Sequence, residues 1–134
     1  FNSLFLLQKR AIRVITFSKW NTHTSPLFEK MHILPLSSLN DFHVGCFMYQ
    51  CVNALLPKHF CNMFSKNMDF HSYDTRNKDS LHMTAHRLTL RKQSICIFGP
   101  KLWNSLPPRI RNLQNIHLFK RHYKSVLMDN LVLQ

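Results

Sequence analysis

Apolar residues recur every three or four positions along much of this 134-residue chain, and this spacing predicts a mainly helical fold. The first such stretch runs from residue 3 to about residue 18. Lys9, Arg10 and Arg13 occupy the positions between its apolar residues, as in an amphipathic helix with a basic outer face. We expect the core to bury the stripe made of Leu4, Leu7, Ala11, Val14 and Ile15.

Two further helices are predicted before residue 57. Ser25-Pro26 has the form of an N-cap followed by proline, so a short helix should cover residues 27 to about 32. Ser38 and Asp41 resemble a capping box, and the apolar run at 39–55 predicts the longest and best buried helix. With the short piece at 58–64, this region should supply the aromatic core residues Phe42, Phe47, Phe60 and Phe64.

The pattern changes after residue 64. Residues 65–86 are polar and aperiodic, which predicts a loop. Residues 88–98 alternate apolar with polar side chains, which is typical of a short β-hairpin or one bent strand. Gly99-Pro100 should end that element.

The C-terminal part returns to helix. Residues 100–106 read as one or two helical turns that carry Trp103, and Pro107-Pro108 interrupts them. Asn115 is then the predicted N-cap of a last helix. Its buried stripe should consist of Ile116, Phe119, Tyr123, Val126 and Leu127.

The predicted fold class is therefore mainly α, with a small β-hairpin or strand element. A length of 134 residues and a hydrophobic content of 45% fit one small helical domain over residues 1–134. Within it we expect a helical core at about 3–64, a polar loop at 65–86 and a basic β/helix module at 87–130.

Charge narrows the choice of partner. Lys and Arg number 18 against 6 Asp and Glu, so the formal net charge is +12 and the pI is about 10.1. Residues 71–125 hold eleven of the basic residues and only two aspartates, which gives that stretch +9. Such an excess exceeds what solubility requires and favours phosphate-rich polyanions.

Several kinds of chemistry are disfavoured. Gly45 and Gly99 are the two glycines, so no glycine-rich nucleotide-binding loop can be written, and we expect no cofactor and no small-molecule substrate. Six acidic residues are few for two-metal phosphoryl chemistry. His71, Ser72 and Asp74 lie close in sequence, but nothing specifies an oxyanion hole, so a polar loop is the better interpretation.

The sequence also argues against metal binding and against membrane binding. No Cys-x2-Cys pair occurs, and His82 with His86 would face one metal only if their segment were helical. The apolar run at 4–7 is too short for a signal or a membrane span, and the first helix needs its apolar stripe for the core. We therefore expect no membrane partner.

The setting should be intracellular, either cytoplasmic or nuclear, and not secreted. Four cysteines occur without a secretory signal, and Cys46 and Cys51 lie where a core helix would bury them as reduced thiols. Because the chain opens at Phe1 rather than at methionine, we expect a fragment of a longer protein.

The order of several motifs is similar to one family. Gln8-Lys9-Arg10-Ala11-Ile12-Arg13 in the first helix is followed by His71-Ser72-Tyr73-Asp74-Thr75-Arg76-Asn77, then by Gln93-Ser94-Ile95. The strongest signal is Phe98-Gly99-Pro100-Lys101-Leu102-Trp103-Asn104-Ser105-Leu106-Pro107, and Phe119-Lys120 closes the series. From about residue 7 to 127 the chain resembles the C-terminal region of reverse transcriptases from LINE-type (non-LTR) retrotransposons, particularly jockey-like elements.

This resemblance implies a region that follows the polymerase fingers and palm and helps to hold template and primer. The family's Tyr-x-Asp-Asp loop and its endonuclease residues have no counterpart here, so the chain alone should not be an enzyme. The Cys/His zinc knuckle with which some of these elements end is also absent from this sequence. RNA or DNA and the upstream polymerase domain are the expected partners. The alternative is a structural or assembly remnant that packs against that domain without binding nucleic acid.

We expect phosphate contacts from basic residues of the second half and base stacking from Tyr73. Trp103 between Leu102 and Leu106 is more typical of a core plug than of a stacking platform. The predicted nucleic-acid-binding residues are Tyr73, Arg76, Arg87, Arg91, Lys92, Lys101, Arg109, Arg111, Lys120 and Lys124.

Overall fold

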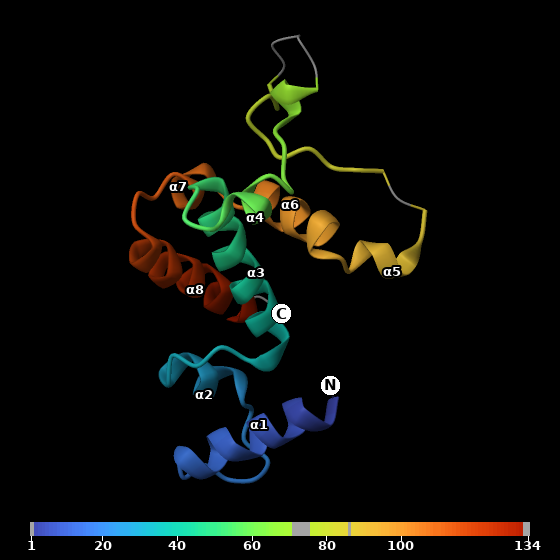
Figure 1. The fold of residues 1–134 in the computed structure, drawn as a ribbon. Coiled ribbons are helices and arrows are strands. Elements are labelled where there is room, and N and C mark those ends of the chain that lie inside the picture. Colours follow the sequence, from blue (N-terminus) through green and yellow to red (C-terminus); the bar gives the residue numbers. More distant parts are fainter. Residues whose placement is uncertain (1, 71–75, 86, 133–134) are drawn as a thin grey trace. The chain divides into compact units, whose positions relative to one another are not determined.

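A computed structural model describes residues 2–70, 76–85 and 87–132 of the chain (Figure 1). Over these residues the chain forms eight α-helices and one short 3-10 helix, without a β-strand. The predicted mainly helical fold is confirmed. The helices are α1 (Asn2–Ile15), α2 (Ser25–Lys30), α3 (Leu36–Val52), α4 (Lys58–Cys61), η1 (Asn67–Asp69), α5 (Thr89–Lys92), α6 (Ile95–Ser105), α7 (Pro108–Arg111) and α8 (Ile116–Val132).

The β element predicted at 88–98 is absent from the described part of the chain, since α5 and the start of α6 occupy this stretch. The side chain of Ser94 accepts a hydrogen bond from the Cys96 N–H at 3.4 Å and so acts as the N-cap of α6. Buried Ile97, Pro100 and Trp103 then repeat every three residues, which is a helical spacing. The apolar–polar alternation over residues 88–98 therefore arises where α5 ends and α6 begins, and it does not mark a strand.

The chain folds as two compact units. The terminal unit contains the residues up to His43 together with the chain from Lys120 onward, and the central unit is Val44–Phe119. Helices α3 and α8 each contribute residues to both units. Each unit has its own buried residues.

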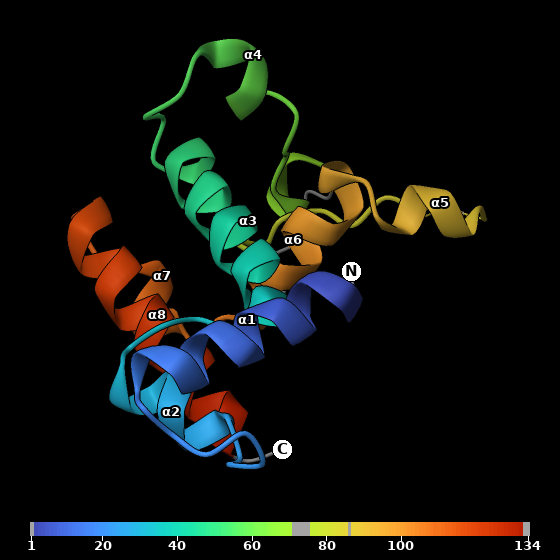
Figure 2. The same ribbon diagram turned by 90° about the horizontal axis from the view of Figure 1, so that it is seen from below.

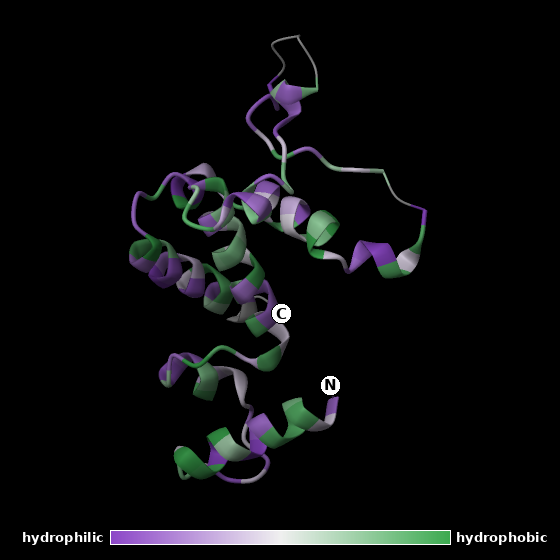
Figure 3. Cartoon of the chain, in the orientation of Figure 1, coloured by the Kyte–Doolittle hydropathy of each residue, from purple (hydrophilic) through white to green (hydrophobic). Residues whose placement is uncertain are grey.

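In the terminal unit, α1 and α2 lie side by side in both ribbon views (Figures 1 and 2). Helix α1 is amphipathic as predicted, but it buries a different face. Ile12 is buried and Gln8 is half-buried, whereas the predicted core stripe Leu4, Leu7, Ala11, Val14 and Ile15 is exposed. Figure 3 shows that hydrophobic residues recur along the whole of α1. The helical period was therefore right and the choice of inward face was wrong.

Gln8 connects α1 to the start of α3 through two side-chain hydrogen bonds. Its side-chain amide donates to the Leu34 carbonyl at 3.0 Å, and its amide oxygen accepts from the Leu36 N–H at 2.8 Å. This second bond satisfies a backbone donor at the first residue of α3. The capping box predicted at Ser38 and Asp41 is consequently wrong, because α3 already begins at Leu36 and a distant side chain provides the cap.

The remaining helix ends follow the sequence more closely. Helix α2 begins at Ser25, with Thr24 as its N-cap residue, so Ser25 is helical rather than the cap. Asn115 accepts from the His117 N–H at 2.8 Å, which confirms the predicted cap of α8. On α8, Tyr123 is buried in the terminal unit, where its ring stacks on Phe42 and its hydroxyl donates to the Asp41 carbonyl at 3.1 Å.

The central unit is organised around three buried aromatic rings. Tyr49 from α3 packs on Phe119 with ring centroids 4.5 Å apart, and Trp103 from α6 meets both rings at 6.4 and 6.0 Å. The Tyr49 hydroxyl donates to the Leu113 carbonyl at 2.6 Å, so its polar end is satisfied. Trp103 is 4% exposed, which confirms its interpretation as a core plug.

The other aromatic core predictions hold only in part. Phe42, Phe47 and Phe64 are half-buried, and Phe60 is 46% exposed, so its assignment to the core is wrong. Phe60 follows α3 by a short turn and touches the core edge through one edge-to-face contact with Phe47 at 6.2 Å. A four-residue helix such as α4 cannot bury a full face.

Gly99 and Pro100 lie inside α6, although they were predicted to end a β element there. Proline removes one helical hydrogen bond and disfavours the α conformation of the residue before it, through clashes with that residue's N–H and Cβ. Glycine has no Cβ, so the helix continues. A Cβ on Gly99 would also come within 2.6 Å of the buried Met48 sulfur.

The predicted loop has its own internal order where it is described. Lys66 and Leu81 form an isolated antiparallel bridge, and the Asn67 side chain donates to the Asn77 carbonyl at 2.9 Å. Asn104 of α6 then holds the Leu81 backbone from both sides, donating to its carbonyl at 2.9 Å and accepting from its N–H at 3.0 Å. Leu81 is buried as a result.

Three helices end in the same way despite the shortage of glycine. The residues that follow α1, α2 and α3 include Phe17, His32 and Ala54, which have φ of 51°, 51° and 54°. In each case the next residue's N–H bonds a carbonyl five residues back, as in a Schellman motif. This left-handed position normally holds glycine or asparagine, so each ending carries some backbone strain.

Candidate nucleic-acid interface

Residues 87–119 of the central unit contain six Arg or Lys and no Asp or Glu. We call these six residues the basic series. Arg87 precedes α5, Arg91 and Lys92 end α5, Lys101 lies on α6, and Arg109 and Arg111 lie on α7. The series contains no carboxylate of its own, so its formal charges all have the same sign.

Five members of the basic series are exposed, and Arg111 is half-buried. Among the described residues, none of the six forms an ion pair with a carboxylate. Their positive charges are therefore not neutralised by described internal partners. Arg76, which lies within the polar loop, is also exposed and forms no ion pair with a described carboxylate.

The basic series follows the helices instead of forming one tight cluster. In Figures 1 and 2, α5 lies beyond the start of α6, and α7 follows the other end of α6. A strand that contacts both Arg91 and Arg109 would have to span the eleven residues of α6, about 16 Å. This layout suits an extended polyanion better than a small one.

Arg111 differs from the other members. Its Nε is buried and has no hydrogen-bond acceptor among the described residues. A half-buried guanidinium reaches a phosphate less readily than an exposed one, so Arg111 is the weakest predicted contact in the series. The sequence pattern does not indicate this difference, since Arg109 and Arg111 share one helical turn.

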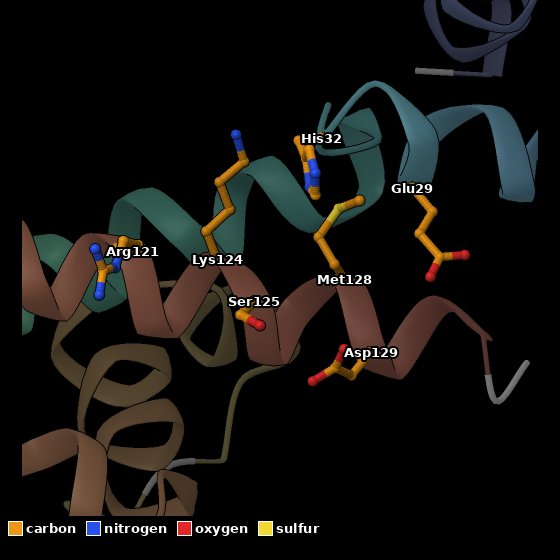
Figure 4. Close-up of a pocket in the computed structure, with 7 residues that line it drawn as sticks. All are labelled: Glu29, His32, Arg121, Lys124, Ser125, Met128 and Asp129. Carbon is orange, nitrogen blue, oxygen red and sulfur yellow. The ribbon is translucent and has the colours of Figure 1, made fainter.

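Lys120 and Lys124 belong to the terminal unit. Lys120 is exposed, and Lys124 is half-buried beside a hollow of about 420 Å³ between α2 and α8. Figure 4 shows Lys124 and His32 on one side of α8 and Asp129 on the opposite side. The hollow is lined by Glu29, His32, Arg121, Lys124, Ser125, Met128 and Asp129. Two carboxylates thus offset two cations, which makes this hollow a poor phosphate site.

Two predictions fall on residues outside the described ranges. Tyr73, the predicted stacking residue, is one of them, and so is His86 of the possible metal pair. Over the described ranges, no group of three or more His, Cys, Asp or Glu side chains is placed to hold a metal ion. No helix in those ranges has the length and apolar character that a membrane crossing requires.

The cysteines are structural where they are buried. All four are free thiols, with Cys46 and Cys51 buried and Cys96 exposed. Desolvation by burial, with a smaller contribution from Cys61, raises the pKa of Cys51 to about 11. A thiol with this pKa carries almost no thiolate near neutral pH, which disfavours a nucleophilic role for Cys51.

The motif that carries the family resemblance works mainly inside the fold. Gly99 allows the close approach of Met48, Pro100 and Trp103 are buried, and Asn104 holds the loop at Leu81. Lys101 is the exposed charged residue of this motif. Its spacing is thus explained by packing, and only Lys101 points to a polyanion.

Sequence reasoning gave no role to Phe17 and Trp20, which are among the most exposed apolar side chains of the chain at 98% and 86%. They line a hollow at the end of α1 with Arg10 and Arg13. The available signal was the alternation of aromatic and basic residues just after the predicted helix, in Phe17-Ser18-Lys19-Trp20.

Comparisons of the chain with protein-family models, with curated proteins and with solved structures give no match.

Proposed function

We propose that this chain binds RNA or DNA through the basic series, as a non-catalytic C-terminal region of a reverse transcriptase from a LINE-type retrotransposon. In this role it holds template and primer for a polymerase domain elsewhere in the parent protein. Neither a membrane nor a small-molecule substrate takes part. The role belongs inside the cell, in the cytoplasm or nucleus.

One observation carries the proposal: the basic series is mostly exposed, lacks a carboxylate and is not ion-paired among the described residues. Like charges close together repel one another, and a polyanion relieves this repulsion, while the counterions condensed on its phosphates are released to solution. The motif resemblance also supports nucleic-acid binding, since it relates the chain to proteins that handle RNA and DNA.

Charge reversal tests the proposal. Arg91→Glu with Lys92→Glu changes two exposed side chains at the end of α5, so stability should be nearly unchanged. Two lost phosphate contacts correspond to a loss of about 25- to 60-fold in affinity for single-stranded RNA or a template-primer duplex at 0.1 M salt.

The matched control is Lys30→Glu with Lys58→Glu. It makes the same change in net charge at two exposed positions outside the basic series. Equal losses in the two double variants would show that net charge alone matters and would contradict a defined interface. Thermal unfolding of both variants checks that folding is intact.

A structural or assembly role is the second candidate function, and the exposed apolar stripe of α1 supports it. Leu4, Leu7, Val14 and Ile15 of α1 are 55% to 73% exposed, although their spacing suits burial. Monomeric proteins rarely leave such a stripe uncovered. Unchanged nucleic-acid affinity after reversal of Arg91 and Lys92 favours this role, with the stripe packed against the parent's polymerase domain.

A further inference from the structure

A hollow of about 640 Å³ at the C-terminal end of α1 combines aromatic and cationic side chains. It lies wholly within the terminal unit. Phe17 and Trp20 are almost fully exposed there, at 98% and 86%. The residues that line it are Arg10, Arg13, Val14, Phe17, Ser18 and Trp20.

Hydrogen bonds to two backbone carbonyls shape this hollow. The Ser18 N–H bonds the Arg13 carbonyl at 2.9 Å, and Phe17 between them adopts a left-handed φ of 51°. The Arg13 Nε donates to the Thr22 carbonyl at 2.9 Å, which ties the segment carrying Trp20 back to α1. The hollow is therefore built by polar contacts and does not depend on burial of its two aromatic rings.

Neither ring is used by the fold. Phe17 and Trp20 stack on no other ring among the described residues, and their exposure means that folding gains little from their apolar surface. Phe17 also occupies a backbone position that favours glycine. Neither packing nor local conformation accounts for an aromatic residue at this place.

The basic residues that line the hollow indicate which kind of ligand would bind against Phe17 and Trp20. Arg10 is exposed, Arg13 also lines the hollow, and neither forms an ion pair in the described part of the chain. Guanidinium groups match phosphate geometry, and aromatic faces stack on unpaired bases. A duplex offers no free base faces, because its bases already stack on one another.

We infer that the hollow at the end of α1 binds a single-stranded segment of RNA or DNA, with bases on Phe17 and Trp20 and phosphates at Arg10 and Arg13. This inference rests on the proposed function and adds to it a second contact, separate from the basic series and selective for single strands.

The test uses the full chain and a 12-nucleotide oligouridylate. Its affinity is measured for the parent chain and for Trp20→Ala, Phe17→Ala and Leu55→Ala, the last being an exposed apolar control at 57% exposure that is not among the residues lining the hollow. Losing one stacked base lowers affinity about 5- to 150-fold, so each aromatic variant should lose this much. Leu55→Ala should bind like the parent chain.

Two further measurements make the result specific. Binding should quench tryptophan fluorescence in the parent chain, and Trp20→Phe should keep most of the affinity while losing the quench, since Trp103 is buried. A 12-base-pair duplex should bind the parent chain and Trp20→Ala equally, because stacking does not contribute.

The outcomes separate this inference from the proposed function. The inference alone is overturned if both aromatic substitutions leave oligouridylate affinity unchanged while charge reversal of Arg91 and Lys92 lowers it. No binding by the parent chain overturns both. Loss of self-association or of binding to anionic vesicles in Trp20→Ala, with unchanged oligouridylate affinity, assigns the hollow to another occupant and also overturns the inference.

Discussion

Substituting Gly99 by alanine probes the packing of α6 on α3 in the central unit. The added methyl group would lie 2.6 Å from the Sδ and 3.4 Å from the Cγ of Met48. Met48 is fully buried, so its side chain has little room to move aside. The substitution also gives the residue before Pro100 a Cβ, which disfavours the helical conformation there.

The magnitude follows from opposing contributions. Alanine gains about 1 kcal/mol over glycine in a helix interior. Overpacking a well-filled core costs about 1–3 kcal/mol, and the clash before proline adds to that cost. We expect Gly99→Ala to lower the free energy of unfolding by about 1–2 kcal/mol, which corresponds to about 3–10 °C in the thermal midpoint.

Urea unfolding followed by circular dichroism measures this effect in two backgrounds. In Met48→Ala the opposing sulfur is gone, whereas the helix-propensity and proline contributions are unchanged. The destabilisation by Gly99→Ala should therefore shrink by about 1–3 kcal/mol in that background. An equal effect of Gly99→Ala in both backgrounds would refute the packing explanation.

Ala54→Gly should raise the free energy of unfolding by about 0.5–1 kcal/mol in a urea titration, because Ala54 has a left-handed φ at the end of α3, and a loss would contradict this. Desolvation raises the pKa of Asp41, so the folded state binds its proton more tightly than the unfolded state. Stability should then fall as pH rises from below the ordinary value of 3.8 through the raised pKa, and Asp41→Asn should be more stable than the parent chain above this window and not below it; thermal midpoints between pH 3 and 7 test this. A disulfide reagent at pH 8 should modify exposed Cys96 first and Cys51 only after denaturant is added, and rapid native reaction of Cys51 would contradict its burial.

Local signals in the sequence were enough where one side chain decides the structure. Asn115 caps α8 through its own side chain, and Trp103 has apolar neighbours on both sides that mark it as core. The stripe on α8 was also recognisable, because Phe119 and Tyr123 recur at helical spacing and are both buried. In these cases the local pattern and the tertiary packing agree.

The sequence-based predictions were wrong where a residue far away in the sequence determines the local structure. The start of α3 depends on Gln8, which is 28 positions away, so a local capping box could not reveal it. The inward face of α1 depends on which neighbours cover it, and an amphipathic helix with exposed apolar residues has two candidate faces. Gly99 before Pro100 was misread because the pair often breaks structure, whereas here glycine removes the clash that would do so.

The candidate site shows the same limit. Composition located the excess of positive charge, and the structure adds that five of the six residues in the basic series are exposed. It also shows that Arg111 is half-buried and that Lys124 lies near carboxylates, which no sequence pattern indicated. Exposure of Phe17 and Trp20 was equally unreadable, since aromatic residues are buried more often than not.

The salt dependence of nucleic-acid binding tests the central claim most directly. Affinity of the full chain for single-stranded RNA and for a template-primer duplex is measured over a range of salt concentrations. Five phosphate contacts, as expected for the exposed members of the basic series, predict a log-log slope of about −3.5 on the single strand and −4.5 on the duplex. A slope near zero, or no binding at low salt, would contradict the claim that this chain holds a sugar-phosphate backbone.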